Sequence, residues 1–226
     1  MLSGAAQAND IQAGADVRAF GNNERLSYLN LTAGTALCGC GDLWLNLNGC
    51  FSKRTTFSNA AATIAHGGSD VELLLGYRPK EYPFSLALGV AIPNTASRSN
   101  ETDLTYRASY YLLKRDDAEF SIDSFGAATV SPLYIAGVSG SYRVGAVRLR
   151  ASAGAPVQGN NSISLTTGLP NRVGLFSLGA EWKPGLLRGD AFTVWITNQL
   201  GWTTGMAATP ALGGNPGIGI SYTVKF

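Results

Sequence analysis

Charged residues are scarce in this chain of 226 residues. Aspartate, glutamate, lysine and arginine together make up 14% of it, against roughly a quarter in a typical soluble domain. The net charge is only +2, and the lysines and arginines are scattered along the chain. That pattern lacks the basic patch of a nucleic-acid-binding protein, so we expect no nucleic-acid partner.

Long hydrophobic runs are missing as well. No segment approaches the ~18 consecutive apolar residues of a membrane-spanning helix, so such a helix is excluded. Hydrophobic residues make up 45% of the chain and its mean hydropathy is +0.06, which is ordinary. Two classes remain: a poorly charged soluble β protein, or a membrane barrel whose apolar residues are spread out by alternation.

The first residues carry a weak processing signal. Ala6-Gln7-Ala8 is a small-x-small pattern of the kind after which signal peptidase cleaves, but no basic region and no full apolar run precede it. Two interpretations of residues 1–8 remain open: the remnant of a signal peptide, or a flexible end. No helical period and no linker follow, so we expect 9–226 to form one all-β domain.

What the chain does have is a two-residue alternation of apolar and polar side chains, which is typical of β-strands. In 82–92, for example, Phe84, Leu86 and Leu88 alternate with small residues. With two less regular segments, the pattern predicts about twelve strands: 11–20, 25–34, 42–51, 70–78, 82–92, 104–113, 118–130, 132–144, 145–157, 172–183, 191–202 and 217–226.

The connections between these segments fall into two groups that alternate along the chain. Long ones (53–69, 93–101, 158–171 and 203–215) alternate with short ones (79–81, 114–117, 144–145 and 184–190). The one exception is the short link 129–131. Short turns at one end of the strands and long loops at the other are typical of a barrel that crosses a membrane.

Two features indicate which face would point inward. The polar face is largely Gly, Ala and Ser, which suits the limited space of a barrel lumen better than a water-exposed sheet. Aromatic residues also gather near strand ends on the apolar face, as in the girdles at membrane interfaces: Tyr77, Tyr82, Tyr106, Tyr142, Trp182, Trp202, Tyr222 and Phe226. We therefore expect an all-β fold, a closed antiparallel transmembrane up-and-down barrel of about twelve strands.

The last ten residues, G-I-G-I-S-Y-T-V-K-F, form an alternating strand that ends on an aromatic. Tyr222-x-Val224-x-Phe226 resembles the C-terminal signature of bacterial outer-membrane β-barrel proteins. The resemblance implies a Gram-negative outer membrane as the site, a lipid bilayer as partner, and reading of the last strand by the barrel-assembly machinery. An even strand number puts both termini on one side, the periplasmic side. Twelve-stranded channels for acidic oligosaccharides offer an analogy, although their lumen is much more basic.

Charged residues on the lumen side are the main candidates for function. Two interpretations remain open: an internal salt-bridged network, or a selectivity lining such as charged rings provide in pores. In a pore, the group Arg143, Arg148 and Arg150 should favour anions. The candidates for the lining are Arg107, Glu119, Asp123, Arg143, Arg148, Arg150, Glu181 and Lys183, and further lumen charges are expected at Asp16, Arg18, Glu72, Arg78 and Asp103.

An enzyme would need an organised nucleophile and base. The one histidine, His66, has Ser69 and Asp70 nearby but lies in an expected external loop, so we expect no catalytic residue. The Cys38-x-Cys40 pair resembles half of a metal site that no other residue completes, so we expect no metal and no cofactor.

Cys50 presents two alternatives, because an odd number of cysteines leaves one thiol over in an oxidising compartment. If 42–51 crosses the membrane, Cys50 lies too far from Cys38 and Cys40 for a disulfide. If Asn48-Gly49 is instead a hairpin turn, 42–47 and 50–57 form a short external ribbon.

Three functions follow in order of preference. The first is an outer-membrane porin, a passive channel for small polar or anionic solutes. The second is a non-conducting barrel that serves as a structural component or docks a protein partner through the loops 53–69, 158–171 and 203–215. The third is an integral membrane hydrolase acting on lipid or peptide.

Overall fold

A computed structural model of the chain describes residues 10–20, 25–37, 40–58, 63–92, 102–127, 133–159, 175–187, 189–197 and 217–226. These residues contain no helix, and hence none long and apolar enough to span a membrane. They form twelve strands: β1 Asp10–Phe20, β2 Arg25–Leu37, β3 Gly41–Ser58, β4 Thr63–Pro79, β5 Phe84–Ile92, β6 Asp103–Lys114, β7 Ala118–Ala127, β8 Leu133–Val144, β9 Val147–Gly159, β10 Leu175–Trp182, β11 Ala191–Thr197 and β12 Gly217–Lys225.

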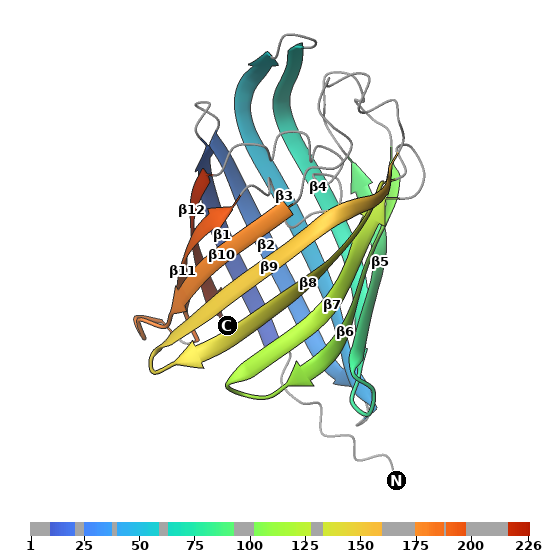
Figure 1. Ribbon diagram of the computed structural model, residues 1–226, viewed down its shortest axis with the longest axis vertical. Helices are drawn as coiled ribbons and strands as arrows, with labels where there is room; N and C mark the ends of the chain where they lie inside the picture. Colours follow the sequence, from blue (N-terminus) through green and yellow to red (C-terminus); the bar gives the residue numbers. More distant parts are fainter. Residues whose placement is uncertain are drawn as a thin grey trace.

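The strands close into a single barrel in which each one pairs antiparallel with its neighbours in the sequence (Figure 1). The last strand returns to the first, with Ala15 opposite Tyr222, and the Phe226 amide donates to the Ile11 carbonyl at 2.8 Å. Closure leaves no unpaired sheet edge within the barrel wall, as a membrane requires. The prediction of a twelve-stranded barrel closed by its terminal strand is confirmed.

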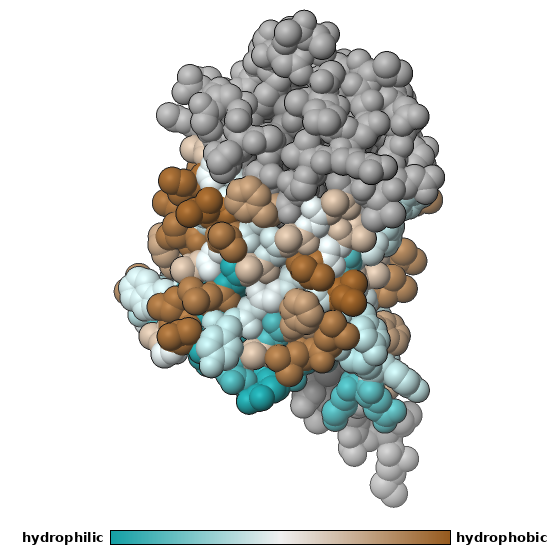
Figure 2. Space-filling model, in the orientation of Figure 1, coloured by the Kyte–Doolittle hydropathy of each residue, from teal (hydrophilic) through white to brown (hydrophobic). Residues whose placement is uncertain are grey.

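The two faces of the wall follow from the alternation in each strand. Outward apolar side chains are highly exposed: Leu29, Leu75, Leu88 and Ile218 each expose more than half of their surface. Figure 2 shows groups of apolar side chains on the visible face of the described part of the barrel. Inward polar side chains are buried instead: Asp16, Asn46, Asn48, Glu72, Thr193 and Thr197. Apolar outside and polar inside is the arrangement of a barrel built for lipid.

β1 begins and β12 ends at the lower end in Figure 1, where the connections are short. The short connections are the segments between β2 and β3 at 38–40, between β4 and β5 at 80–83, between β6 and β7 at 115–117, between β8 and β9 at 145–146, and between β10 and β11 at 183–190. Gly145 has a φ of 61° in the tightest of these turns, which glycine adopts without strain. The end of the barrel that has the short turns therefore also holds the start of β1 and the end of β12.

The prediction of a long external loop over 53–69 is wrong. β3 continues to Ser58 and β4 begins at Thr63, and the two remain paired through Phe57 and Ile64 after a register irregularity between Ser52 and Thr55. Threonine, phenylalanine and isoleucine favour strands, which explains why pairing continues there. The hairpin extends beyond the pairing of β3 with β2 and of β4 with β5, and in Figure 1 it rises above the other strands.

The alternative of a hairpin turn at Asn48-Gly49 is also wrong. Both residues lie within β3, opposite Asn30 and Leu29 on one side and Glu72 and Val71 on the other. Pairing on both sides outweighs the local turn preference of the dipeptide.

Cys40 and Cys50 therefore lie at opposite ends of one extended segment. Ten residues at about 3.3 Å each separate their backbones by about 33 Å, which excludes a disulfide between them. Cys40 is exposed in the short turn before β3, and Cys38 lies outside the described residues.

Several predictions fall on parts of the chain that the structure does not describe. They are the signal-peptide remnant over 1–8, Trp202, and the loops at 93–101 and 203–215. Of the loop expected over 158–171, residues 158 and 159 belong to β9, and the rest lies outside the described residues.

Candidate functional site

The candidate site is the lumen, where inward side chains surround two cavities that share Arg107. The wall cavity, of about 260 Å³, lies against β6–β9 and is lined by Ser109, Tyr111, Glu119, Ser121, Asp123, Ser139 and Ser152 among others. The central cavity, of about 310 Å³, lies between β1–β3 and β9–β12 and is lined by Asp16, Asn30, Asn46, Asn48, Arg150, Glu181, Thr193, Trp195 and Ser221 among others. Arg107 therefore contributes to the wall of each cavity.

Arg107 is held by an ion pair that crosses a strand. Its Nη2 lies 2.7 Å from Glu72 Oε2, although Arg107 is on β6 and Glu72 on β4. Between them, β5 presents the small residues Ala87, Gly89 and Ala91 inward at the level of the pair, so the guanidinium can pass over it. Gly89 is required by close approach, because a Cβ there would lie 2.0 Å from the Leu73 carbonyl oxygen.

Four side chains of β2 and β3 form a closed hydrogen-bonded cycle, the amide ring. Asn46 donates to Thr32 Oγ1 at 2.6 Å, Thr32 donates to Asn30 at 3.1 Å, Asn30 donates to Asn48 at 2.5 Å, and Asn48 donates back to Asn46. Asn48 Nδ2 also donates to Glu72 Oε2 at 3.2 Å. The amide ring and the Glu72–Arg107 pair therefore form one connected network along the wall. Because its polar groups are hydrogen-bonded to one another, the network makes this part of the wall rigid.

Two further ion pairs belong to the central cavity. Arg18 donates to both carboxylate oxygens of Asp16, at 3.1 and 3.0 Å. Arg150 Nη2 lies 2.5 Å from Glu181 Oε2 on the neighbouring strand. Opposite charges are therefore matched locally, which lowers the cost of placing them in a narrow space.

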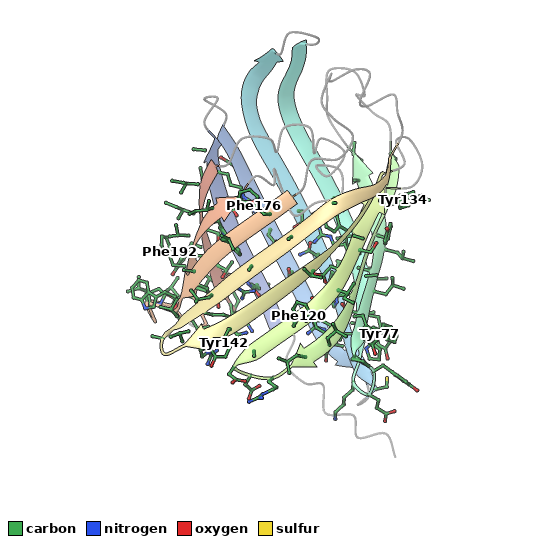
Figure 3. All side chains as sticks on the ribbon, in the orientation of Figure 1. Tyr77, Phe120, Tyr134, Tyr142, Phe176 and Phe192 are labelled. Carbon is green, nitrogen blue, oxygen red and sulfur yellow. The ribbon has the colours of Figure 1, made fainter. Side chains whose placement is uncertain are left out.

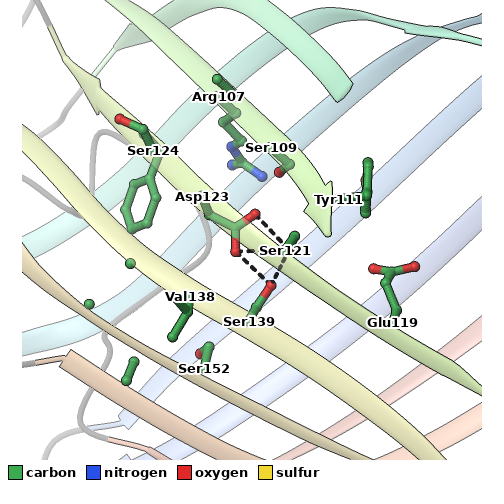
Figure 4. A pocket seen from close by; sticks show the side chains of 15 residues that line it. Arg107, Ser109, Tyr111, Glu119, Ser121, Asp123, Ser124, Val138, Ser139 and Ser152 are labelled. Atoms are coloured by element: carbon green, nitrogen blue, oxygen red, sulfur yellow. Dashed lines mark hydrogen bonds between the residues drawn. The ribbon is translucent and has the colours of Figure 1, made fainter. Parts of the chain in front are cut away.

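The wall cavity has a carboxylate at its centre, as Figure 4 shows. Asp123 accepts hydrogen bonds from Ser121 at 3.0 Å and from Ser139 at 2.6 Å, and the two serine hydroxyls lie 2.9 Å apart. Ser152 Oγ is buried here and has no hydrogen-bond partner among the described residues. The cavity therefore offers hydroxyl groups and a carboxylate to a polar molecule.

Trp195 lines the central cavity from β11, between two glycines. Gly179 on β10 and Gly219 on β12 stand directly opposite it in the sheet. A Cβ on Gly179 would lie 2.3 Å from the Trp195 ring, so the ring occupies the space over Gly179. On the other side its Nε1 donates to Ser221 at 3.2 Å. The indole therefore lies along the wall.

The structure distributes the predicted lining charges in three ways. Arg107, Glu119, Asp123, Arg150 and Glu181 line the two cavities. Arg148 donates to Ser141 Oγ at 3.0 Å and to the Asp116 carbonyl at 2.6 Å, near the short-turn end. Arg143 and Lys183 are exposed at strand ends and line neither cavity. Of the wider set, Arg78 lies next to Tyr111, and the Asp103 side chain is not described.

The predicted interface aromatics lie at both ends of the wall. Tyr82, Tyr142, Trp182 and Phe226 are each at least half exposed, and all are near the short-turn end; Figure 3 labels Tyr142 and Tyr77 there. Tyr106 lies toward the other end, where its hydroxyl meets Ser124 at 2.9 Å and its ring lies 6.1 Å from that of Tyr134.

The turn between β10 and β11 is organised by a buried carboxylate. Asp190 accepts from the amides of Gly185, Leu186 and Leu187 and from the Tyr222 hydroxyl. Burial raises the pKa of Asp190, but the bonds from Leu187, Tyr222, Gly185 and Leu186 outweigh it and hold the pKa below its ordinary value. The turn is thereby fastened to β12.

The expectation that His66 lies in a loop is wrong, because it lies in β4 opposite Thr55. In an extended strand, the backbone of Ser69 is about 10 Å further along. Within the described ranges, no group of three or more His, Cys, Asp or Glu residues could hold a metal ion.

Sequence reasoning missed the amide ring and the lumen-facing tryptophans. The signal for the amide ring was present, since Asn30 lies between Leu29 and Leu31, and Asn46 between Leu45 and Leu47. Trp195, between Val194 and Ile196, also points inward. Because all three residues are apolar, the alternation of apolar and polar side chains does not distinguish it from its neighbours. Trp44 is likewise inward: a Cβ on Gly76 would lie 2.0 Å from its ring.

Comparison with solved structures supports the fold. An outer membrane channel from Pseudomonas putida F1 matches over 100% of both chains with a TM-score of 0.60 and 13% identity. The chain has the fold of a bacterial outer-membrane β-barrel. The outer membrane protein Omp33 of Acinetobacter baumannii matches over 96% of this chain and 98% of its own, with a TM-score of 0.48 and 10% identity. A mutant of the Rh. blastica porin matches over 97% and 99%, with a TM-score of 0.42 and 8% identity.

No protein-family model matches the chain, and no curated protein matches it. The geometry of the lumen therefore carries the argument about function.

Proposed function

We propose that this protein is an outer-membrane barrel that acts as a passive channel for small polar solutes, with both termini in the periplasm. The observation that carries the proposal is the inverted wall, apolar outside and lined inside by hydroxyls, amides and charges around two cavities. Apolar solutes would gain nothing from such a lining, whereas polar solutes would exchange hydrogen bonds with it.

Single-channel recording in a planar bilayer tests the proposal. We expect stepwise conductance from the native protein. Ser139→Trp, which places an indole in the wall cavity, should lower the unit conductance. Ile122→Trp on the neighbouring strand β7 is the matched control because Ile122 is exposed on the outer face and lines neither cavity, and it should leave the conductance unchanged. Equal effects of the two variants, or no steps at all, would contradict the proposal.

Selectivity for anions is a second part of this proposal, carried by Arg148 and Arg150. Arg148 donates to two neutral acceptors, Ser141 Oγ and the Asp116 carbonyl, whereas Arg150 forms an ion pair with Glu181. Reversing both charges to glutamate should shift the reversal potential in a salt gradient toward cations. An unchanged reversal potential would refute the selectivity role of these two residues and leave the channel itself standing.

A non-conducting barrel is the second candidate, and a specific observation favours it. The side chains of Leu74 and Thr197 are fully buried, and Arg107, which is paired with Glu72, lines both cavities of the described lumen. Such a barrel would serve as a structural component or dock a protein partner through its external loops. The absence of conductance at any voltage, with the native fold retained, would favour it.

A membrane hydrolase is the third candidate. It would have to use His66 from within β4, and we expect His66→Ala to keep any lipid or peptide hydrolysis that the purified protein shows.

In biogenesis, we propose that the barrel-assembly machinery reads the final strand. Phe226→Ala should then lower the assembled fraction in cells without changing the conductance of the channels that do assemble.

A further inference from the structure

We propose that the central cavity binds a neutral, polyhydroxylated ring, such as the pyranose ring of a sugar, with Trp195 as its apolar platform. The inference rests on the proposed channel function and names the class of solute that the central cavity binds, whereas the anion selectivity proposed for Arg148 and Arg150 concerns the ion current. It depends on three properties of the cavity: an aromatic ring that the wall holds in place, a high density of hydrogen-bonding groups, and equal numbers of positive and negative side chains in the lining.

The position of Trp195 is determined by the wall and does not need a ligand. The ring lies over Gly179 and is fastened to Ser221 by its indole N–H. It is 8% exposed, and it belongs to the lining of the central cavity. A fixed aromatic surface suits the apolar C–H face of a sugar ring, because little conformational entropy is lost when the two surfaces meet.

The rest of the lining offers both donors and acceptors at short range. Asn30 and Asn48 belong to the amide ring, Thr193 and Ser221 carry hydroxyls, and Asp16 carries a carboxylate. A sugar hydroxyl both donates and accepts, so it can use all of these groups. A site with many polar groups rejects a solute that would leave them unpaired.

Charge balance favours a neutral solute over an ion. Two carboxylates, Asp16 and Glu181, and two guanidinium groups, Arg107 and Arg150, line the central cavity. Each is already in an ion pair: Asp16 with Arg18, Glu181 with Arg150, and Arg107 with Glu72. An anion or a cation would have to compete with these pairs, whereas a neutral hydroxylated ring would only add hydrogen bonds.

The size of the cavity agrees with a single ring. Its volume of about 310 Å³ is at the lower end of the range of about 300–1,000 Å³ for small-molecule sites. One ring would fill it, and longer oligomers would have to pass one ring at a time.

Current block in a planar bilayer tests the inference, with glucose, sorbitol and gluconate as probes. Glucose presents a closed ring, sorbitol is an open chain with similar hydroxyl content, and gluconate carries a negative charge. We expect glucose to reduce the ion current saturably. Sorbitol should reduce it only in proportion to viscosity, and gluconate should block less than glucose.

Variants of Trp195 separate binding from structure. Trp195→Ala should raise the open-channel current, because it frees space, and weaken glucose block about tenfold, which corresponds to about 1.4 kcal/mol. Trp195→Phe should give intermediate block. Trp182→Phe is the matched control because Trp182 is half exposed at the strand end of the outer face, and it should change neither quantity. Heat-modifiable gel mobility verifies that each variant is folded.

Three results would overturn the inference while leaving the channel intact: equal block by glucose and sorbitol, stronger block by gluconate, or unchanged glucose block in both Trp195 variants. If the native barrel conducts no current, the proposed channel function fails instead. Calorimetric titration of the detergent-solubilised barrel with glucose then decides the inference alone. Binding that Trp195→Ala abolishes would support the inference, and no binding would refute it.

Discussion

Removing the Arg107 guanidinium should destabilise the barrel more than removing any exposed charge. In Arg107→Met the side chain keeps its length but loses the ion pair, and Glu72 is left as a carboxylate that is only 2% exposed. Exposed pairs are worth about 0.2–1 kcal/mol, and breaking a buried pair costs about 3–5 kcal/mol.

The Arg107–Glu72 pair lies between those limits. The Arg107 side chain is 28% exposed, and Asn48 continues to donate to Glu72 in the variant. We therefore expect the free energy of unfolding to fall by about 2 kcal/mol. The single-channel current should also change, because Arg107 lines both cavities of the lumen.

Urea titration of the barrel folded in phospholipid vesicles, followed by tryptophan fluorescence, measures this loss. Arg148→Met is the matched control: its guanidinium donates to the neutral acceptors Ser141 Oγ and the Asp116 carbonyl, so it should cost about 1 kcal/mol. A double-mutant cycle with Glu72→Gln should give a coupling of at least about 1 kcal/mol. A cost no larger than that of Arg148→Met, or a coupling near zero, would refute the reasoning.

Two further changes test the packing of the wall and its lower turn. Gly179→Ala puts a Cβ 2.3 Å from the Trp195 ring and should lower the free energy of unfolding by about 1–3 kcal/mol; Gly140→Ala, whose nearest contact would be 3.3 Å, should cost less in the same urea titration, and equal costs would contradict the close packing. For Asp190, whose pKa is held below its ordinary value of 3.8, the stabilisation is fully present above that value and is lost as the pH falls through the lowered pKa. Asp190→Asn should therefore be less stable than the native protein at neutral pH and should lose less stability on acidification below about pH 4; parallel acid-unfolding curves for the two proteins would contradict this role.

Strand number, strand faces and barrel closure could be predicted because each depends on a local signal. The alternation of Leu86 and Leu88 with small residues determines which face points outward, and this face needs no knowledge of distant residues. The resemblance of Tyr222-x-Val224-x-Phe226 to the outer-membrane barrel signature predicts the class of barrel, and the pairing of β12 with β1 follows from closure.

Contacts across strands could not be predicted, because they depend on register. Glu72 and Arg107 are on strands separated by β5, and they meet only because Ala87, Gly89 and Ala91 leave space between them. The same dependence on pairing misled the interpretation of Asn48-Gly49, whose local preference for a turn is overridden by the strands on both sides.

The lumen role of Trp195 escaped sequence reasoning for a different reason. It interrupts the polar face of β11 with an apolar residue, so the alternation gave no contrast at that position. Its function as part of the wall becomes visible only when Gly179 and Gly219 are seen opposite it.

The amide ring has a direction as well as a shape. Every donor in the cycle points the same way around it, from Asn46 through Thr32, Asn30 and Asn48 back to Asn46. Turning one amide over would set two donors or two acceptors face to face, so the amides can reverse only together.

A full reversal would bring the Asn48 oxygen against the Glu72 carboxylate, which now accepts from the Asn48 nitrogen. The contact with Glu72 thus favours one of the two directions in which the hydrogen bonds of the amide ring could run. This part of the wall therefore has one fixed arrangement of amide dipoles. A passing solute would meet the same sequence of donors and acceptors at every crossing.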